Sequence, residues 1–140
     1  MKYTKLIGLK RQLKKAGYPD IPLTASDEQA LLDGCYFDAA KGWHVVDYIE
    51  YHCKLSKGEW KGRPIELLPW QTEQLLVPVF GWRASNGLRR IKKSITFISK
   101  KNGKSTLCSG LVPFFLDLLG DGEGGAEIYM AAKSRDQAGI

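Results

Sequence analysis

The strongest constraint on the fold is a short run in the second half of the chain, where a β-type segment, a basic loop and a helical segment follow one another directly. Residues 94–98, Ser-Ile-Thr-Phe-Ile, are rich in β-branched and aromatic side chains, which predicts a buried strand. Residues 99–103, Ser-Lys-Lys-Asn-Gly, are typical of a tight basic loop. A helix is predicted from Lys104 to about Leu119, with Gly120 as its stop, because apolar residues then recur at helical spacing: Leu107, Leu111, Phe114, Phe115 and Leu118.

The same run carries the residue types that proteins use to hold the phosphates of a nucleotide. Backbone N–H groups at a helix N-terminus attract anions, while Lys104 can reach the outer phosphates and the Ser105 hydroxyl can ligate Mg²⁺. The usual phosphate-loop pattern has a glycine five residues before Gly103, and that position is Ile98 here. Asn102 can adopt left-handed geometry, so the loop can still close. A basic surface turn without a ligand is the alternative interpretation.

A second strand is predicted at residues 126–132, after a glycine-rich loop at residues 121–125. The order strand, helix, strand predicts a βαβ unit, whose two parallel strands are joined by a right-handed crossover. The loop then lies at the carboxyl end of the first strand, which is where phosphate loops occur. The expected fold class is α/β, with a helical N-terminal segment followed by the first βαβ unit of a phosphate-loop NTPase sheet.

Upstream of this unit the chain is predicted to be helical. Residues 5–15 form a basic amphipathic segment that Gly17 and Pro19 end. Thr24 or Ser26 can cap the next helix through a side-chain oxygen. A third helix is indicated by an apolar stripe formed by Val45, Val46, Tyr48 and Ile49.

A fourth helix is predicted from Pro69 to Gly81. We expect a helical N-terminal region at residues 1–60 and the start of a phosphate-loop ATPase domain at residues 61–140. A nucleotide hydrolase needs a second acidic strand to position Mg²⁺, and no apolar strand ending in paired carboxylates follows Ser105. We therefore expect a truncated domain with no catalytic residue of its own, the N-terminal piece of a longer protein.

The formal net charge of +6 is concentrated in two clusters. One precedes the first acidic residue, Asp20, and the other directly precedes the predicted strand: Lys2, Lys5, Lys10, Arg11, Lys14 and Lys15, then Arg89, Arg90, Lys92 and Lys93. Such clusters suit a polyanion such as DNA, whose binding weakens steeply with salt. A solvated helix face and an exposed strand start are the alternative interpretation.

The cysteines and the hydropathy exclude several other classes of protein. Cys35, Cys53 and Cys108 are far apart and lack the spacing of a zinc site, which indicates a reducing compartment. No stretch approaches the length of a membrane span, so no membrane partner is expected.

From about Asp38 onward the chain resembles the large terminase subunit of tailed bacteriophages, the ATPase and nuclease that packages viral DNA. The resemblance rests on ordered blocks: Gly-Arg-Pro-Ile-Glu-Leu at 62–67, Pro-Trp-Gln at 69–71, Phe-Gly-Trp at 80–82, Lys-Lys-Asn-Gly-Lys-Ser at 100–105, Glu-Ile-Tyr-Met-Ala-Ala at 127–132 and Arg-Asp-Gln-Ala at 135–138. In this family a basic residue commonly precedes Asn-Gly-Lys-Ser in the loop, which fits the missing first glycine.

The resemblance implies ATP and Mg²⁺ as cofactors. Lys104 would bind the β- and γ-phosphates, Ser105 would ligate Mg²⁺, and either Lys100 or Lys101 would correspond to the basic residue of the family's loop. Gln71 would recognise adenine, with an ordinary first-turn helix residue as the alternative. The residues expected to bind ATP are therefore Gln71, Lys100, Lys101, Asn102, Gly103, Lys104, Ser105 and Thr106.

The resemblance also implies partners: double-stranded DNA, a portal protein, a small terminase subunit and further copies of the same subunit in the motor. ATP hydrolysis would drive DNA into the procapsid in the cytoplasm of a bacterial host, and a separate C-terminal nuclease domain would cut it. We expect the isolated fragment to bind nucleotide weakly and to hydrolyse essentially none. The alternatives are another phosphate-loop motor, such as a helicase, and a small basic adaptor that binds DNA regardless of nucleotide.

Overall fold

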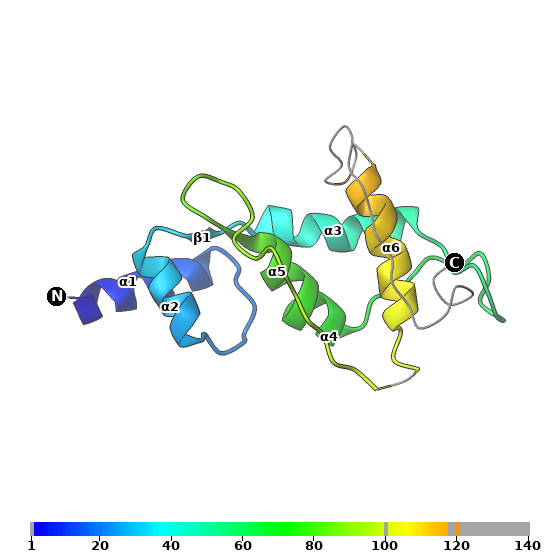
Figure 1. The fold of residues 1–140 in the computed structure, drawn as a ribbon, viewed down its shortest axis with the longest axis horizontal. Helices are drawn as coiled ribbons and strands as arrows, with labels where there is room; N and C mark the ends of the chain where they lie inside the picture. The colour runs from blue at the N-terminus through cyan, green and yellow to red at the C-terminus, as the bar shows by residue number, and fades with distance from the viewer. Residues whose placement is uncertain (1, 100, 118–119, 121–140) are drawn as a thin grey trace.

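The computed structural model describes residues 2–99, 101–117 and 120, and these residues are mainly helical. In chain order the helices and strands are α1 (Lys2–Lys15), α2 (Ala25–Leu32), β1 (Tyr36–Phe37), α3 (Ala39–His52), α4 (Pro69–Gln71), η1 (Thr72–Leu76), α5 (Val77–Gly81), β2 (Trp82–Arg83) and α6 (Lys104–Leu116). Figure 1 shows α3 along the long axis with α5 and α6 against it, and α1 and α2 near the N-terminus. None of these helices is both long and apolar enough to cross a lipid bilayer.

The two N-terminal helices form as predicted. Helix α1 contains the predicted amphipathic segment, and Gly17 follows it with a left-handed φ of 87°. Of the two predicted caps for α2, Thr24 is the one used: its hydroxyl accepts from the Asp27 backbone N–H at 3.2 Å. The Asp27 carboxylate accepts in return from the Thr24 backbone N–H at 2.9 Å, so the two residues form a reciprocal capping box.

Asp27 also joins α2 to the segment after β2. Arg90 Nη1 donates to Asp27 Oδ1 at 2.6 Å, and the Arg90 guanidinium lies 4.7 Å from the centre of the Trp82 ring. Partial burial alone would raise the pKa of Asp27, but the hydrogen bonds from Arg90 and Thr24 outweigh it and hold that pKa below its usual value. Arg90, a member of the second basic cluster, therefore holds two parts of the fold together.

The core is centred on α3, α5 and α6 and extends through Phe37 and Trp82 to Leu13 of α1 and Leu31 of α2. The predicted apolar stripe of α3 is confirmed, because Val45, Val46, Tyr48 and Ile49 are all buried. Glycines let the helices approach closely: a Cβ added at Gly42 would lie 2.7 Å from the Val77 carbonyl oxygen, and one added at Gly110 would lie 2.9 Å from Ile49 Cγ2. Helix α6 is thus packed directly on α3.

The predicted helix from Pro69 to Gly81 is confirmed as a continuous run of α4, η1 and α5. Its middle turn is wider than an α-helix, since the Val77 N–H bonds to the Thr72 carbonyl, five residues back. Pro78 accounts for this turn, because it has no N–H to continue the regular ladder and its ring crowds the carbonyl four residues earlier. Turns of this π type are frequent at functional sites.

The buried strand predicted at residues 94–98 is wrong for the described part of the chain. Within the described residues, no neighbouring strand is hydrogen-bonded to this segment, and the side chains of Ile95 and Phe97 are 81% and 94% exposed. A strand is buried only when neighbours pair with it and cover it, and the predicted partner at residues 126–132 lies outside the described residues. The sheet that does form is small and antiparallel, with Tyr36 opposite Arg83 in β1 and β2.

The predicted end of the helix that begins at Lys104 is also corrected. Helix α6 ends at Leu116, and Asp117 is already in extended geometry, whereas the sequence predicted a helix to about Leu119. Pro113 lies inside the helix and removes one backbone donor from its last turns, which favours an early end.

Candidate functional site

The candidate site is the loop over residues 99–103 together with the first turn of α6. Gly103 is the N-cap of α6 and has left-handed geometry, with φ 73° and ψ 14°. The sequence allowed left-handed geometry at Asn102, whereas the non-glycine residue of this loop that adopts it is Lys101, with φ 65°. The Asn102 side chain instead donates to the Ser99 hydroxyl across the loop. Left-handed residues that alternate with ordinary ones turn backbone N–H groups toward a common point, a geometry that suits anions.

The N-terminus of α6 is open to an anion. Among residues 2–99, 101–117 and 120, no side chain caps it, and its first turn contains no acidic residue. The Leu107 N–H bonds to the Gly103 carbonyl at 2.9 Å, so the helix starts at the loop itself. Lys104 and Ser105 are exposed and Thr106 is half-buried. Within the described part of the chain, nothing therefore compensates the backbone donors of this first turn or the positive end of the helix dipole.

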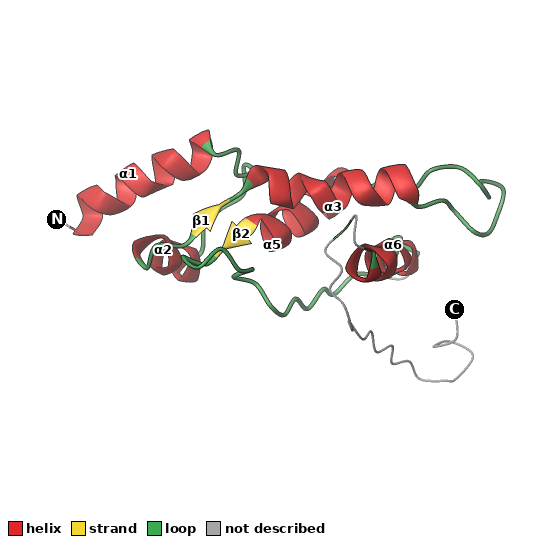
Figure 2. Ribbon diagram, turned by 90° about the horizontal axis from the view of Figure 1, so that it is seen from above, coloured by secondary structure: helices red, strands yellow, loops and turns green. Residues whose placement is uncertain are grey.

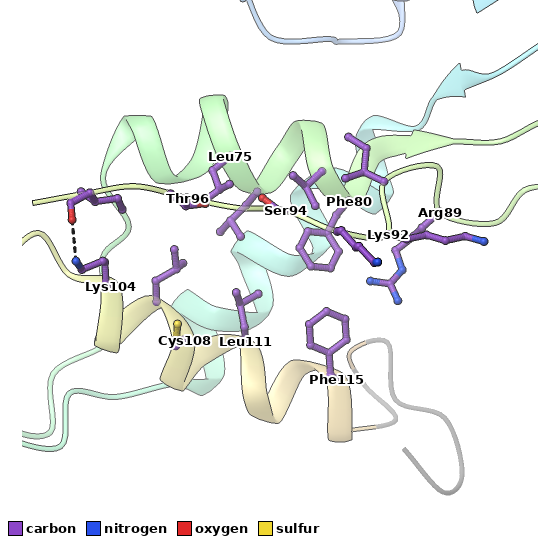
Figure 3. Close-up of a pocket in the computed structure, with 16 residues that line it drawn as sticks. Leu75, Phe80, Arg89, Lys92, Ser94, Thr96, Lys104, Cys108, Leu111 and Phe115 are labelled. Carbon is purple, nitrogen blue, oxygen red and sulfur yellow. Dashed lines mark hydrogen bonds between the residues drawn. The ribbon is translucent and has the colours of Figure 1, made fainter. Parts of the chain in front are cut away.

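Lys104 closes the loop in this structure. Its Nζ donates to the Ile98 backbone carbonyl at 2.7 Å, the contact drawn as a dashed line in Figure 3. Ile98 occupies the position of the missing glycine, so the contact spans the whole loop. An ammonium group has three N–H donors, and Lys104 makes no second hydrogen bond to the described residues. Lys104 is thus positioned at the loop with donors available to a ligand.

The structure brings Gln71 to this loop from a distant part of the sequence. A Cβ added at Gly103 would lie 3.1 Å from Gln71 Nε2. Gln71 is buried, with 4% of its surface exposed, and its Oε1 accepts from the Leu68 N–H at 2.8 Å. Its Nε2 donates to none of the residues described here. The side-chain amide of Gln71 therefore lies next to Gly103, and Gln71 itself directly precedes the π turn η1.

The other predicted site residues are placed only in part. Lys101, Asn102, Gly103, Lys104 and Ser105 are consecutive and exposed at the loop and helix start. Lys100 lies outside the described residues. The roles predicted for all of these residues toward ATP stay predictions.

A groove of about 400 Å³ lies beside the site, between the run from η1 to α5, the extended segment and α6. Figure 3 shows Lys104 at one end of it and Arg89 and Lys92 at the other. Most of the lining between these ends is apolar, including Leu75, Leu111 and Phe115. Such a lining does not suit a polyphosphate, so the candidate phosphate site is the loop end alone.

The far end of α6 is anchored on α3. Tyr48 Oη donates to Asp117 Oδ2 at 2.7 Å, and His44 Nε2 lies 3.3 Å from the Gly120 carbonyl oxygen. Burial, and then the hydrogen bond and the charge of Asp117, raise the pKa of Tyr48 to about 12. No local pattern in the sequence indicates this contact, which depends on the packing of two distant helices. The contact between Tyr48 and Asp117 fixes the end of α6 on α3, and the other end of α6 carries the loop.

The residues that could hold a metal ion are few. Ser105 is the predicted Mg²⁺ ligand and contributes a single hydroxyl, and the described residues contain no group of three or more His, Cys, Asp or Glu side chains placed to bind a metal. Mg²⁺ is commonly bound by one or two protein oxygens together with the phosphates of its nucleotide. The described residues therefore fit a metal that arrives with a nucleotide better than an independent metal site.

The open helix N-terminus, the left-handed loop and the lysine define a candidate phosphate-binding protein. Residues 69–140, just over half of the chain, match the family model described as terminase large subunit, ATPase domain. The chain therefore belongs to this family. No curated protein and no solved structure matches it.

Proposed function

We propose that this chain is the nucleotide-binding N-terminal part of a bacteriophage DNA-packaging motor. Membership of the terminase ATPase family supports the proposal. The observation that carries it is the uncapped start of α6, with Lys104 beside it and no acidic residue in the first turn. The same family match favours a packaging motor over a helicase, which would also use Gln71 and Lys104.

In the proposed complex, Lys104 exchanges the Ile98 carbonyl for the β- and γ-phosphates. A charged phosphate oxygen is a stronger acceptor than a neutral carbonyl, so the exchange is favourable. The backbone N–H groups of residues 103–106 and the side chain of Lys100 or Lys101 complete the phosphate site. Ser105 would ligate Mg²⁺, which neutralises charge between the outer phosphates.

Gln71 is the proposed adenine contact. An amide can donate to and accept from one base edge at the same time. Its Nε2 makes no hydrogen bond to the described residues, whereas its Oε1 accepts from the Leu68 N–H. In adenine binding Nε2 would donate to the base, and Oε1 would accept from the base through its second lone pair while it keeps the Leu68 bond.

The proposed partners are those of a packaging motor. ATP hydrolysis by the assembled protein would move double-stranded DNA through a portal protein into the procapsid, in the bacterial cytoplasm and with a small terminase subunit. A further nuclease domain would cut the DNA. Hydrolysis needs a second acidic strand to position Mg²⁺, and no apolar strand ending in paired carboxylates follows Ser105 in these 140 residues. We therefore expect nucleotide binding by this chain with essentially no turnover.

Calorimetric titration with a non-hydrolysable ATP analogue and Mg²⁺ tests the proposal. Replacing Lys104 with alanine removes a charge-assisted hydrogen bond and is expected to weaken binding by about tenfold or more. Lys14→Ala removes the same charge from the exposed face of α1 and is the matched control, expected to bind like the wild type. Equal affinity of the Lys104→Ala variant and the wild type for the analogue would exclude Lys104 as the phosphate ligand. Hydrolysis of ATP by the wild type that is lost in Lys104→Ala would contradict the expected inactivity of this chain.

A further inference from the structure

An anchored loop projects beyond the end of α3. Residues 54–64, called the Trp60 loop here, are closed at their base by bonds from the Leu55 N–H to the Arg63 carbonyl at 2.9 Å and from the Gly62 N–H to the Leu55 carbonyl at 2.8 Å. Just beyond them Ile65 is buried in the core, with 3% of its surface exposed. Figures 1 and 2 both show the loop extending past the last turn of α3. The base of the loop is therefore fixed to the core while its tip faces solvent.

The tip presents an aromatic side chain to solvent. Gly58 and Gly62 have left-handed φ values of 84° and 85°, which allow two tight turns in succession. Trp60 lies between them and is 55% exposed, and the Arg63 guanidinium lies 4.4 Å from the centre of its ring. A large aromatic residue held on a tip in this way contributes little to the core.

The loop is strongly cationic. It contains four cations (Lys54, Lys57, Lys61 and Arg63) and one anion (Glu59), for a net charge of +3. Throughout the described part of the chain, these four cations form no ion pair. This positive charge is therefore available to a partner.

The other basic surfaces are partly neutralised within the fold. On α1, Lys10 pairs with Glu28, and in the cluster before the extended segment Arg90 pairs with Asp27. The Trp60 loop differs from both because its cations surround an exposed aromatic residue on a fixed support. This combination favours a rigid polyanion as the binding partner of the loop.

We propose that the Trp60 loop binds the phosphate backbone of double-stranded DNA. The lysines would contact phosphates, and the Trp60–Arg63 pair would lie against the sugar edge of a groove. Proteins that bind single strands present several aromatic platforms on which successive bases stack, whereas this loop has one ring, which Arg63 already covers on one side. The inference rests on the proposed function, because DNA is the polyanion that a packaging motor handles.

Fluorescence anisotropy of a short labelled duplex over a series of salt concentrations tests this inference on the full 140-residue chain. The variant is Lys57→Ala with Lys61→Ala, and the control with the same charge change is Lys14→Ala with Lys15→Ala. The loop variant is expected to bind several-fold more weakly, and its slope of log affinity against log salt is expected to fall by about 1.8, or about 0.9 for each phosphate that a lysine no longer neutralises. The control is expected to keep the wild-type slope. Trp60→Ala is expected to weaken binding without changing the slope, because tryptophan carries no charge.

The inference would be overturned by no DNA binding by the wild type, by wild-type affinity and slope in the loop variant, or by an equally large weakening in the α1 control. Competition by polyglutamate as effective per charge as by DNA would assign the loop to an acidic protein surface instead. All substituted side chains here are exposed, and circular dichroism checks that the variants fold. Titration of the loop variant and of Lys104→Ala with the ATP analogue separates the two proposals. If the proposed function holds, nucleotide binding is weakened in Lys104→Ala and keeps its wild-type affinity in the loop variant.

Discussion

Gly103 is the residue on which the geometry of the loop depends most, and Gly103→Ala is expected to damage it in two ways. Placing an alanine in left-handed geometry, at a φ of 73°, costs about 1–2 kcal/mol because of its Cβ. Its Cβ would also lie 3.1 Å from Gln71 Nε2, a few tenths of an ångström too close. Gln71 is buried and bonded to the Leu68 N–H, so its displacement weakens a hydrogen bond worth about 1 kcal/mol. Together these effects are expected to lower the free energy of unfolding by about 2–3 kcal/mol.

Gly58→Ala is the matched control for this prediction. Gly58 has a φ of 84°, and a Cβ there would meet nothing within 4 Å. The control therefore shares the backbone strain and lacks the contact with Gln71. Urea unfolding followed by circular dichroism is expected to show a decrease in stability larger by about 1 kcal/mol for Gly103→Ala than for Gly58→Ala.

Nucleotide affinity provides the second measurement on the same pair of variants. Displacement of the loop moves the backbone N–H groups at the start of α6, so Gly103→Ala is expected to bind the ATP analogue more weakly while Gly58→Ala binds it normally. If the two variants are destabilised equally and both keep wild-type affinity, the contact between Gln71 and Gly103 has no part in the site and the reasoning is refuted.

Two further predictions concern the contacts that hold the fold together. Tyr48→Phe removes the hydrogen bond to Asp117 and is expected to lower the free energy of unfolding by about 2 kcal/mol. Because the folded pKa of Tyr48, about 12, exceeds the ordinary 10.0, this stabilisation is complete below pH 10 and disappears as pH rises through 12. The stability of the wild type should therefore decrease over this alkaline range, and the stability of the variant should not. Arg90→Gln breaks a partly buried ion pair and is expected to lower the free energy of unfolding by about 2 kcal/mol at neutral pH. Since the folded pKa of Asp27 is lowered below its ordinary 3.8, the wild-type contribution is present above pH 3.8 and disappears as pH falls through the folded pKa. Acid unfolding curves that are superimposable for Arg90→Gln and the wild type would contradict this assignment.

The helices were predictable because their signals are local. The Thr24 cap, the apolar stripe from Val45 to Ile49 and the start at Pro69 each depend on residues within a few positions of one another. The loop was predicted as a candidate phosphate site for the same reason, since Gly103 and Lys104 are adjacent. Periodicity and capping are therefore sufficient to place these elements.

The features that were missed depend on residues far apart in the chain or on fine backbone geometry. A buried strand at residues 94–98 needs neighbouring strands that local composition does not supply. The approach of Gln71 to Gly103 follows from helix packing, and no spacing in the sequence indicates it. Pro78 inside a predicted helix was the available signal for the π turn. Left-handed geometry at Lys101 had no signal, because lysine rarely adopts it.

The central claim is that the loop and the first turn of α6 bind the phosphates of a nucleotide. The most direct measurement is an NMR titration of the isotope-labelled chain with the ATP analogue and Mg²⁺, following the backbone amide signals. The account predicts that the amides of residues 103–106 shift most and saturate together, and that Lys104→Ala greatly weakens this response. Amides at the loop that do not move while others saturate, or identical titrations of the wild type and the Lys104→Ala variant, would contradict it.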